Sequence, residues 1–242
     1  MGLKDLFSSS GRQKSRLDKL IKTVTNQYTQ TAERYHAMEQ LLSDGSEEAL
    51  VGLLRRFTIV STKSIEDEEE KGWVYRQLRD MGAKALPAVK KFCLEYDNVA
   101  WALRIVEDVA DETQEWEILD ALLERHPPGY ERDPKKKLQV LTHLSEIDDP
   151  KVAELLAGYV EDADEGVRFL AAEQLLDIGE EEHAKKALVD RLCNPEEDSV
   201  RLRTKILDGL TEHGWDLSED AERIRPRLGN EHDLQGGRVI RR

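Results

Sequence analysis

Histidine and cysteine are the side chains most often used in nucleophilic, acid–base and metal chemistry, and in this sequence they are isolated. The two cysteines, Cys93 and Cys193, stand at positions of apolar helical periodicity and belong to no CxxC or Cys/His ligand set. We therefore predict buried free thiols, no metal and reducing surroundings. We predict capping or solvent-exposed roles for the six histidines: His36, His126, His143, His183, His213 and His232.

Signatures of common enzyme chemistry are also missing from the sequence. It contains no GxxxxGKS or GxxxxGKT loop, no GxGxxG, no GxSxG, no HExxH and no EF-hand loop. These patterns supply the phosphate cradle, the nucleophile or the metal ligands that such reactions require. We therefore predict a protein with no catalytic residue and no cofactor.

Charge is abundant and unevenly distributed along the chain. The net charge is −14, hydrophobic residues make up 39% and charged residues 36%, which suits a thin helical array better than one large core. Residues 1–43 and 221–242 each carry +3, which leaves −20 for the residues between them. An acidic body repels phosphate backbones at long range, so the composition disfavours nucleic acid as the partner.

Helix-forming segments repeat along the chain at intervals of about 33 residues. Segments 167–179 and 200–210 both open with Val-Arg after an acidic turn, and a related segment, 99–106, begins 68 residues before Val167. Segments with apolar residues at helical spacing alternate with these, and turns rich in Gly, Pro, Asn or Asp separate them. The pattern predicts five helix pairs: 46–82, 83–111, 112–148, 149–179 and 180–214.

These features resemble the HEAT-repeat family, specifically short bacterial arrays. Gly82 ends one predicted helix pair and Pro87 stands in the first helix of the next, while acidic turns precede Val-Arg at 164–168 and 198–201. The resemblance covers residues 46–215. It implies an all-α fold, a right-handed α-solenoid of about five HEAT-type helix pairs, and a scaffold that binds other macromolecules.

The ends of the chain and two insertions depart from this regular pattern. We predict an N-terminal capping helical segment at 1–45, with one long or broken helix, a solenoid at 46–217 and a flexible basic tail at 218–242. Polar loops are predicted at 61–70 and 127–134. Insertions in repeat proteins often map to a binding face, and whether these two loops or the tail bind anything stays open.

The resemblance places the second helix of each pair on a concave face, where a partner would bind. Arginines on that face suit an acidic partner. For Arg168 and Arg201 we favour a structural role, in which they bond to Asp164, Asp198 or neighbouring acids and tie adjacent repeats together. The candidate partner-binding residues are Arg76, Trp101, Arg104, Gln139, His143, Gln174, Arg203 and Lys205.

Two enzyme classes built on HEAT-type repeats serve as comparisons for function. One class holds iron with repeated His-Glu dipeptides, and this sequence contains none. The other, a DNA glycosylase or nucleic-acid-binding type, remains the alternative, because it uses aromatic, acidic and basic residues on its inner face. The residues that could serve it are Trp73, Trp101, Arg104, Asp108 and Trp116.

The preferred interpretation is a non-enzymatic scaffold for a protein partner of unknown identity. No apolar run approaches the ~20 residues of a membrane span, and Met1–Ser10 lacks the apolar stretch of a secretory signal. We therefore expect a cytoplasmic monomer. Residues 1–7 could form a short amphipathic turn, although a frayed terminus is the simpler expectation.

Overall fold

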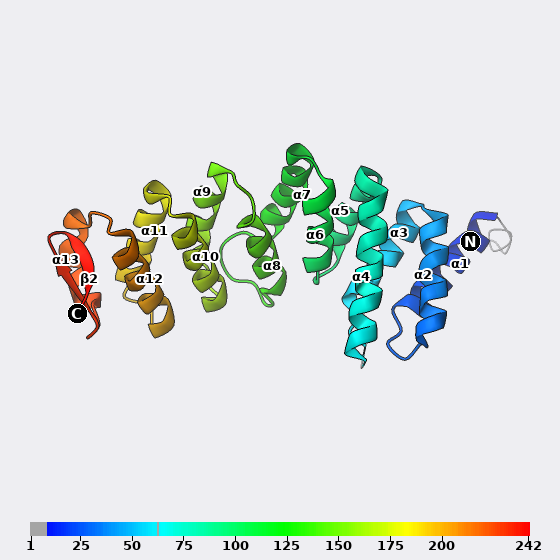
Figure 1. The fold of residues 1–242 in the computed structure, drawn as a ribbon, viewed down its shortest axis with the longest axis horizontal. Helices are drawn as coiled ribbons and strands as arrows, with labels where there is room; N and C mark the ends of the chain where they lie inside the picture. Colours follow the sequence, from blue (N-terminus) through cyan, green and yellow to red (C-terminus); the bar gives the residue numbers. More distant parts are fainter. Residues whose placement is uncertain (1–8, 62) are drawn as a thin grey trace. The chain divides into compact units, whose positions relative to one another are not determined.

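The computed structural model describes residues 9–61 and 63–242, so the turn considered for residues 1–7 lies outside it. The contacts divide the chain into two compact units, Met1–Leu122 (unit 1) and Leu123–Arg242 (unit 2). The boundary falls near the end of α7 (Glu112–Arg125). Both units are built almost entirely of helices that follow one another in chain order, which confirms the all-α, solenoid-type fold class (Figure 1).

Unit 1 consists of three helix pairs before α7. The pairs are α1 (Ser9–Val24) with α2 (Thr31–Asp44), α3 (Glu47–Leu54) with α4 (Ser64–Met81), and α5 (Leu86–Glu95) with α6 (Ala100–Val109). The 3₁₀ turns η2 (Arg55–Thr58) and η3 (Gly82–Ala85) follow α3 and α4. The expected N-terminal helix is therefore broken at residues 25–30, and the whole segment forms a helix pair of its own.

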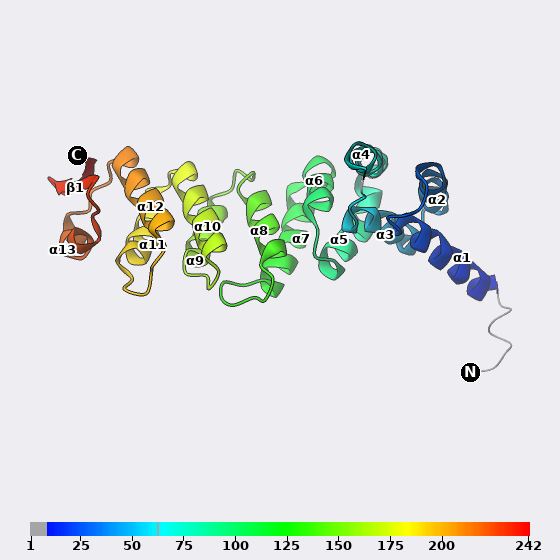
Figure 2. The same ribbon diagram turned by 90° about the horizontal axis from the view of Figure 1, so that it is seen from below.

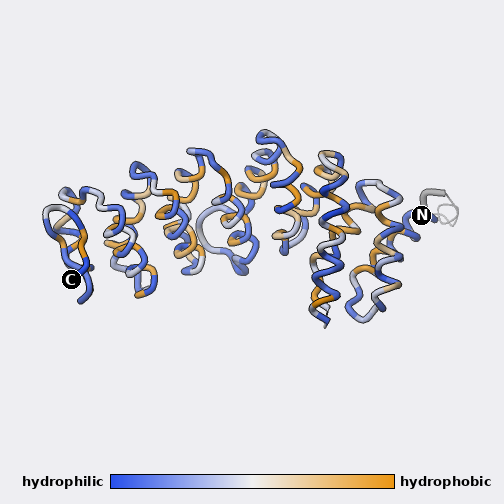
Figure 3. Tube along the Cα trace, in the orientation of Figure 1, coloured by the Kyte–Doolittle hydropathy of each residue, from blue (hydrophilic) through white to orange (hydrophobic). Residues whose placement is uncertain are grey.

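The helices of unit 1 form two layers. Helices α1, α3 and α5 contact one another in sequence, as do α2, α4 and α6, and Figure 2 shows the two rows side by side. Polar and apolar residues alternate along the helices (Figure 3), so each helix buries one face between the layers. The pair α1–α2 makes the same kind of contacts as the pairs after it, which suits a segment that covers the first repeat.

The predicted polar loop at 61–70 is wrong, because α4 begins at Ser64 and runs through most of that segment. Asp67, Glu70 and Lys71 are buried on one face of α4, at the i, i+3 and i+4 spacing that brings helical side chains together. The acidic run is therefore the start of a helix whose inner face carries charge.

Two buried arginines neutralise the acids of α4. Glu70 accepts hydrogen bonds from Nε of Arg34 and from Nε of Arg56, both at 2.6 Å. Asp67 accepts from Nη2 of Arg56 and from Nζ of Lys71, again at 2.6 Å each. This cluster joins α2, η2 and α4, since its members come from all three elements. Charges this deeply buried are tolerated because every one has an opposite partner.

Unit 2 continues with α8 (Lys135–Leu144), α9 (Pro150–Tyr159), α10 (Glu165–Ile178), α11 (Glu181–Cys193) and α12 (Val200–His213). Helix α9 contacts α11, while α8 contacts α10 and α10 contacts α12, so this unit also has two layers (Figure 2). Local signals set the ends of the helices. The side chains of Asp164 and Ser199 cap the N-termini of α10 and α12, and Gly179 and Gly214 end these helices with φ of 71° and 62°.

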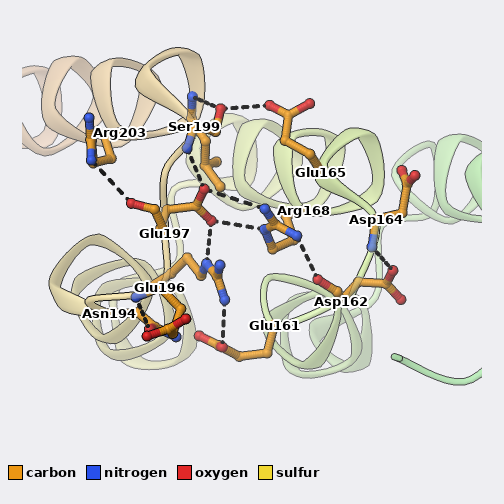
Figure 4. A network of polar contacts seen from close by, with 12 residues as sticks. Glu161, Asp162, Asp164, Glu165, Arg168, Asn194, Glu196, Glu197, Ser199 and Arg203 are labelled. Carbon is orange, nitrogen blue, oxygen red and sulfur yellow. Dashed lines mark hydrogen bonds and ion pairs between the residues drawn. The ribbon is translucent and has the colours of Figure 1, made fainter. Parts of the chain in front are cut away.

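Turns of neighbouring helix pairs in unit 2 are joined by ion pairs (Figure 4). Arg168 of α10 donates from Nε to Glu197, in the turn before α12, at 2.9 Å, and from Nη1 to the carbonyl oxygen of Asp162. Glu197 also accepts from Nε of Arg191 at 2.5 Å, and these side chains are buried. The inter-repeat role expected for Arg168 is confirmed, with Glu197 as the partner in place of Asp164.

Arg201 plays the same role on the surface. Its Nη2 donates to Glu165 at the start of α10 at 2.6 Å, so the exposed guanidinium bridges α12 and α10. The partner is again a glutamate near the turn and not Asp198. Asp164 instead caps α10 by accepting from the N–H of Val167, which explains why it is not used by an arginine.

The predicted loop at 127–134 is confirmed, and it is anchored to unit 2. No helix or strand covers these residues. Gly129 donates its N–H to Oδ2 of Asp162 at 2.9 Å, and the buried Lys137 donates to that carboxylate at 2.7 Å and to the carbonyl of Gly129. The hydroxyl of Tyr159 donates to the carbonyl of His126 at 2.8 Å. The loop is therefore held at its base by buried polar groups.

The prediction of a flexible tail at 218–242 is wrong. These residues form the turns η4 (Ser218–Asp220) and η5 (Arg225–Arg227), the short helix α13 (Ala221–Ile224) and an antiparallel hairpin of β1 (His232–Gln235) and β2 (Arg238–Arg241). The segment has few apolar side chains, but Ile224, Leu234 and Val239 are all buried and give it a small core. Helix α13 contacts α11 and β2 contacts α12, so the segment covers the last helix of each layer.

Candidate partner-binding surface

Trp101 and Arg104 lie one turn apart on α6 and form the centre of an exposed aromatic and cationic surface. The guanidinium carbon of Arg104 is 4.9 Å from the centre of the Trp101 ring and 5.2 Å from that of Tyr75 on α4. Arg104 is exposed, while both rings are half-buried. The arginine therefore covers two aromatic faces and still presents its N–H groups to solvent.

Contacts between aromatic rings hold Trp101 in place. Trp101 stacks on the buried Phe57 of η2, with ring centres 5.8 Å apart and an interplanar angle of 11°. Tyr75 meets Trp101 edge to face at 5.9 Å. Because Trp101 contacts both Phe57 and Tyr75, its side chain has little freedom to leave its position.

The phenol of Tyr75 is fixed by Asp108, which lies one turn beyond Arg104 on α6. The hydroxyl donates to the Asp108 carboxylate, and this hydrogen bond raises the pKa of Tyr75, with burial adding to the effect. At neutral pH the phenol is thus a neutral donor. Arg79, four residues after Tyr75, places its guanidinium carbon 5.7 Å from the same ring. Tyr75 therefore contacts two arginines and a carboxylate, and it links α4 to α6.

Arg76 stands next to this cluster on α4 and is exposed. Its Nη1 lies 3.2 Å from the position a Cβ would occupy at Gly72, so the side chain folds back along its own helix. Half-buried Trp73 meets Tyr35 of α2 edge to face, with ring centres 5.9 Å apart. Among the residues the structure describes, neither Arg76 nor Arg104 forms an ion pair with a carboxylate, so both guanidinium charges are available.

The predicted binding residues of unit 2 have different surroundings. Lys205 is half-buried and pairs with Glu173 of α10 at 2.9 Å, a hydrogen bond that raises the pKa of the lysine. Arg203 is also half-buried and donates from Nη1 to the carbonyl oxygen of Glu197 at 3.1 Å. Lys205 therefore serves contact between repeats, whereas Arg203 keeps most of its N–H donors for other partners.

Two predicted residues are excluded from a solvent-facing surface by their burial. His143 is 6% exposed and Gln174 is 6% exposed, so each side chain points into the packed interior of its helix layer. Gln139 is half-buried. Apolar periodicity alone did not reveal this, because a polar residue can occupy an inward-facing helical position without disturbing the pattern.

The residues considered for a glycosylase-like site are used in packing. Trp101 stacks on Phe57, Trp73 contacts Tyr35, and Asp108 accepts the Tyr75 hydroxyl. Within the described part of the chain, no group of three or more His, Cys, Asp or Glu side chains is arranged to hold a metal ion. In that same part of the chain, none of the helices is long and apolar enough to cross a membrane.

Sequence reasoning identified Arg104, Trp101 and Arg76 but missed Tyr75, which connects the two helices. Its signal was present, since Tyr75 and Arg79 are four residues apart and therefore neighbours on a helix surface. The pairing of Tyr75 with Arg104 had no local signal, because those residues are 29 positions apart in different helices.

A comparison with known families agrees with the layered helix pairs. Residues 119–207 match the family of HEAT repeats. The predicted HEAT-type resemblance is therefore confirmed for that part of the chain. HEAT repeats are generally protein-interaction scaffolds and are typically non-enzymatic. No curated protein matches the chain.

Proposed function

We propose that the protein is a non-enzymatic scaffold that binds a protein partner through the exposed face of α4 and α6. The observation that carries this proposal is the position of Arg104, whose guanidinium covers Trp101 and Tyr75 without a carboxylate partner among the described residues. The chain as a whole has a net charge of −14, so this cation stands in an acidic protein. Such a cation fits a partner that brings its own carboxylate.

The chemistry of the surface indicates an acidic partner with apolar side chains. Trp, Tyr and Arg are the residues most enriched among binding hot spots. The two aromatic residues supply large, rigid contact areas at a low cost in conformational entropy. Trp101 and Tyr75 are already held by neighbouring rings, which lowers the entropy cost of binding. Arg76 and Arg104 would attract the acidic residues of the partner and orient it.

Charge reversal at the surface tests this proposal. The tagged full-length protein is used to capture partners from its native cell with nuclease added, and it is compared with the Arg76→Glu, Arg104→Glu double variant. We expect a stoichiometric protein partner with the native protein and a loss of about tenfold or more with the variant. Unchanged helical circular dichroism shows that the variant is folded.

A matched variant separates a local effect from a change in net charge. Arg132→Glu combined with Arg225→Glu reverses two exposed arginines of unit 2 and changes the net charge by the same amount. This control should capture the partner normally. Equal capture by both double variants would contradict the proposed surface. Capture that disappears when nuclease is added would favour the nucleic-acid alternative.

We further propose that the protein acts in the cytoplasm as a monomer. Cys93, which is buried, and Cys193, which is half-buried, form no disulfide, as expected in reducing surroundings. Light scattering coupled to size-exclusion chromatography measures the mass directly. A mass near the 27.7 kDa of one chain is the expected result, and twice that mass would contradict it.

A further inference from the structure

A cavity in unit 2 lies between the first half of α12 and residues 226–232, which lead into the hairpin and include the first residue of β1. Its volume is about 470 Å³, which falls in the usual range for small-molecule sites of about 300–1,000 Å³. Val200, Leu207 and Leu228 contribute apolar surface, and Arg203 and Arg227 line the cavity from α12 and η5. The cavity exists only because the C-terminal segment is folded onto the last helix pair.

The two arginines are held in place without having their charges neutralised. Arg203 donates from Nη1 to the carbonyl oxygen of Glu197 at 3.1 Å, and Arg227 donates from Nη2 to the carbonyl oxygen of Cys193 at 3.2 Å. Neither guanidinium has a carboxylate within ion-pair distance in the described part of the chain. Each group has five N–H donors, so most of them remain for a ligand.

This lack of carboxylates sets the two arginines apart from several arginines nearby. Four nearby arginines form ion pairs: Arg168 and Arg191 with Glu197, Arg201 with Glu165, and Arg223 with Asp190 and Asp220. Two guanidinium groups without a carboxylate at one cavity are therefore able to receive an anion from outside.

The other ionisable groups at the cavity do not cancel this charge. Glu231 also lines it, but its side chain is 73% exposed and lies 3.9 Å from Arg241. His232 contributes to the lining, and its Nε2 is 2.9 Å from the carboxylate of Asp208. One exposed carboxylate thus stands against two guanidinium groups, and the lining is cationic on balance.

The apolar lining indicates what the anion should be attached to. Val200 is 67% exposed, although large aliphatic side chains are usually covered, and Leu207 follows it two turns further along α12. A ligand that covers Val200 and Leu228 removes apolar surface from water while its charged group meets the arginines.

We propose that this cavity binds a small amphiphilic anion, a carboxylate or a phosphate group on a short apolar body, with Arg203 and Arg227 holding the charged group. Planar guanidinium groups suit both anions because they bind carboxylate and phosphate oxygens in pairs. The site is separate from the surface on α4 and α6, so it adds a ligand to the proposed scaffold function and does not depend on it.

Titration by nuclear magnetic resonance tests the proposal with defined probes. Hexanoate and hexyl phosphate are added separately to the ¹⁵N-labelled full-length protein, and the amide signals of Thr204 and Asn230, which line the cavity, are followed. We expect saturable shifts with at least one anion, and the tighter of the two identifies the natural charged group. Neutral hexanol should bind at least about tenfold more weakly, because it forms no charge-assisted hydrogen bonds.

Variants of the arginines complete the test. The Arg203→Gln, Arg227→Gln double variant should lose anion binding about tenfold or more, whereas Arg201→Gln, which alters an arginine of α12 outside the cavity lining, should not. Arg203→Lys combined with Arg227→Lys keeps the charge and should bind with intermediate strength. Dispersed amide spectra show that each variant is folded.

Two results would overturn the proposal. The first is the absence of saturable shifts at Thr204 and Asn230 with both anions in the native protein. The second is binding that is equally strong for hexanol or unaffected in the folded glutamine variant. Neither result bears on partner capture through Arg76 and Arg104, so failure of this site and failure of the scaffold function can be told apart.

Discussion

Arg34 and Glu70 are 36 positions apart and form a bidentate ion pair inside unit 1. Nε of Arg34 donates to Oε2 of Glu70 at 2.6 Å, and Nη2 donates to Oε1 at 3.0 Å, with both side chains at most 2% exposed. Nε of Arg56 donates to the same Oε2. One carboxylate therefore pairs with two buried arginines from different elements.

Removing that carboxylate should strongly destabilise the protein. Glu70→Gln leaves Arg34 and Arg56 buried without their shared anion, and breaking a buried pair in this way costs about 3–5 kcal/mol. Urea denaturation followed by circular dichroism measures the change. The neighbouring Glu69 is exposed, so Glu69→Gln should change stability by less than about 0.5 kcal/mol. Equal effects of the two variants would contradict the buried cluster.

Glu197 should make the protein less stable as the pH falls into the acid range. Burial by itself raises the pKa of Glu197, but hydrogen bonds from Arg168, from the N–H of Ser199 and from Arg191 outweigh it, so the pKa lies below 4.5. A carboxylate whose pKa is lower in the folded state stabilises the protein above pH 4.5, and this contribution is lost as the pH falls through the folded-state pKa.

The prediction is that Glu197→Gln lowers stability at pH 7 and flattens its decline in acid. The glutamine cannot carry the charge that titrates, so the part of the pH dependence that belongs to this group disappears. Thermal unfolding at a series of pH values from 7 to about 3 measures both effects. Exposed Glu196 provides the control, and a Glu196→Gln variant whose pH profile is equally flat would refute the assignment.

Gly209 allows α12 to approach α10 closely. A Cβ at this position would lie 2.3 Å from Cδ2 of Leu176, which is buried. Gly209→Ala should therefore destabilise the protein by about 1–3 kcal/mol, despite the higher helix propensity of alanine. At Gly158 of α9 the nearest atom is 3.5 Å away, so Gly158→Ala should stabilise by about 0.5–1 kcal/mol. Chemical denaturation of both variants measures this difference in sign.

The C-terminal hairpin should contribute to the free energy of unfolding of the protein. The N–H of Leu217 donates to the carbonyl of Gly237 at 2.7 Å, and Val239 of β2 is 1% exposed. Val239→Ala should destabilise by about 1–3 kcal/mol, whereas Arg238→Ala, which alters the exposed neighbour, should have an effect below about 0.5 kcal/mol. Hydrogen exchange of the hairpin amides provides a second measurement, and rapid exchange throughout 232–241 would show that the segment is flexible after all.

The sequence by itself determined the helix pairs, because the signals that define them are local. Apolar spacing identifies the buried face of each helix, and capping residues such as Ser199 and glycines such as Gly179 and Gly214 mark its ends. Interactions within one or two turns suffice for this. The same local evidence located the 127–134 loop, whose prolines and glycine prevent a helix.

Only the tertiary structure decided which charges meet and what covers the last helix pair. The acidic run at 66–70 resembles a solvated loop until Arg34 and Arg56 are brought against it from other elements. Likewise, the polar segment after residue 217 orders because α11 and α12 offer it an apolar surface. The physical reason is the same in both cases. A buried charge or apolar side chain is stabilised by a partner that is distant in sequence, and the local sequence pattern does not identify that partner.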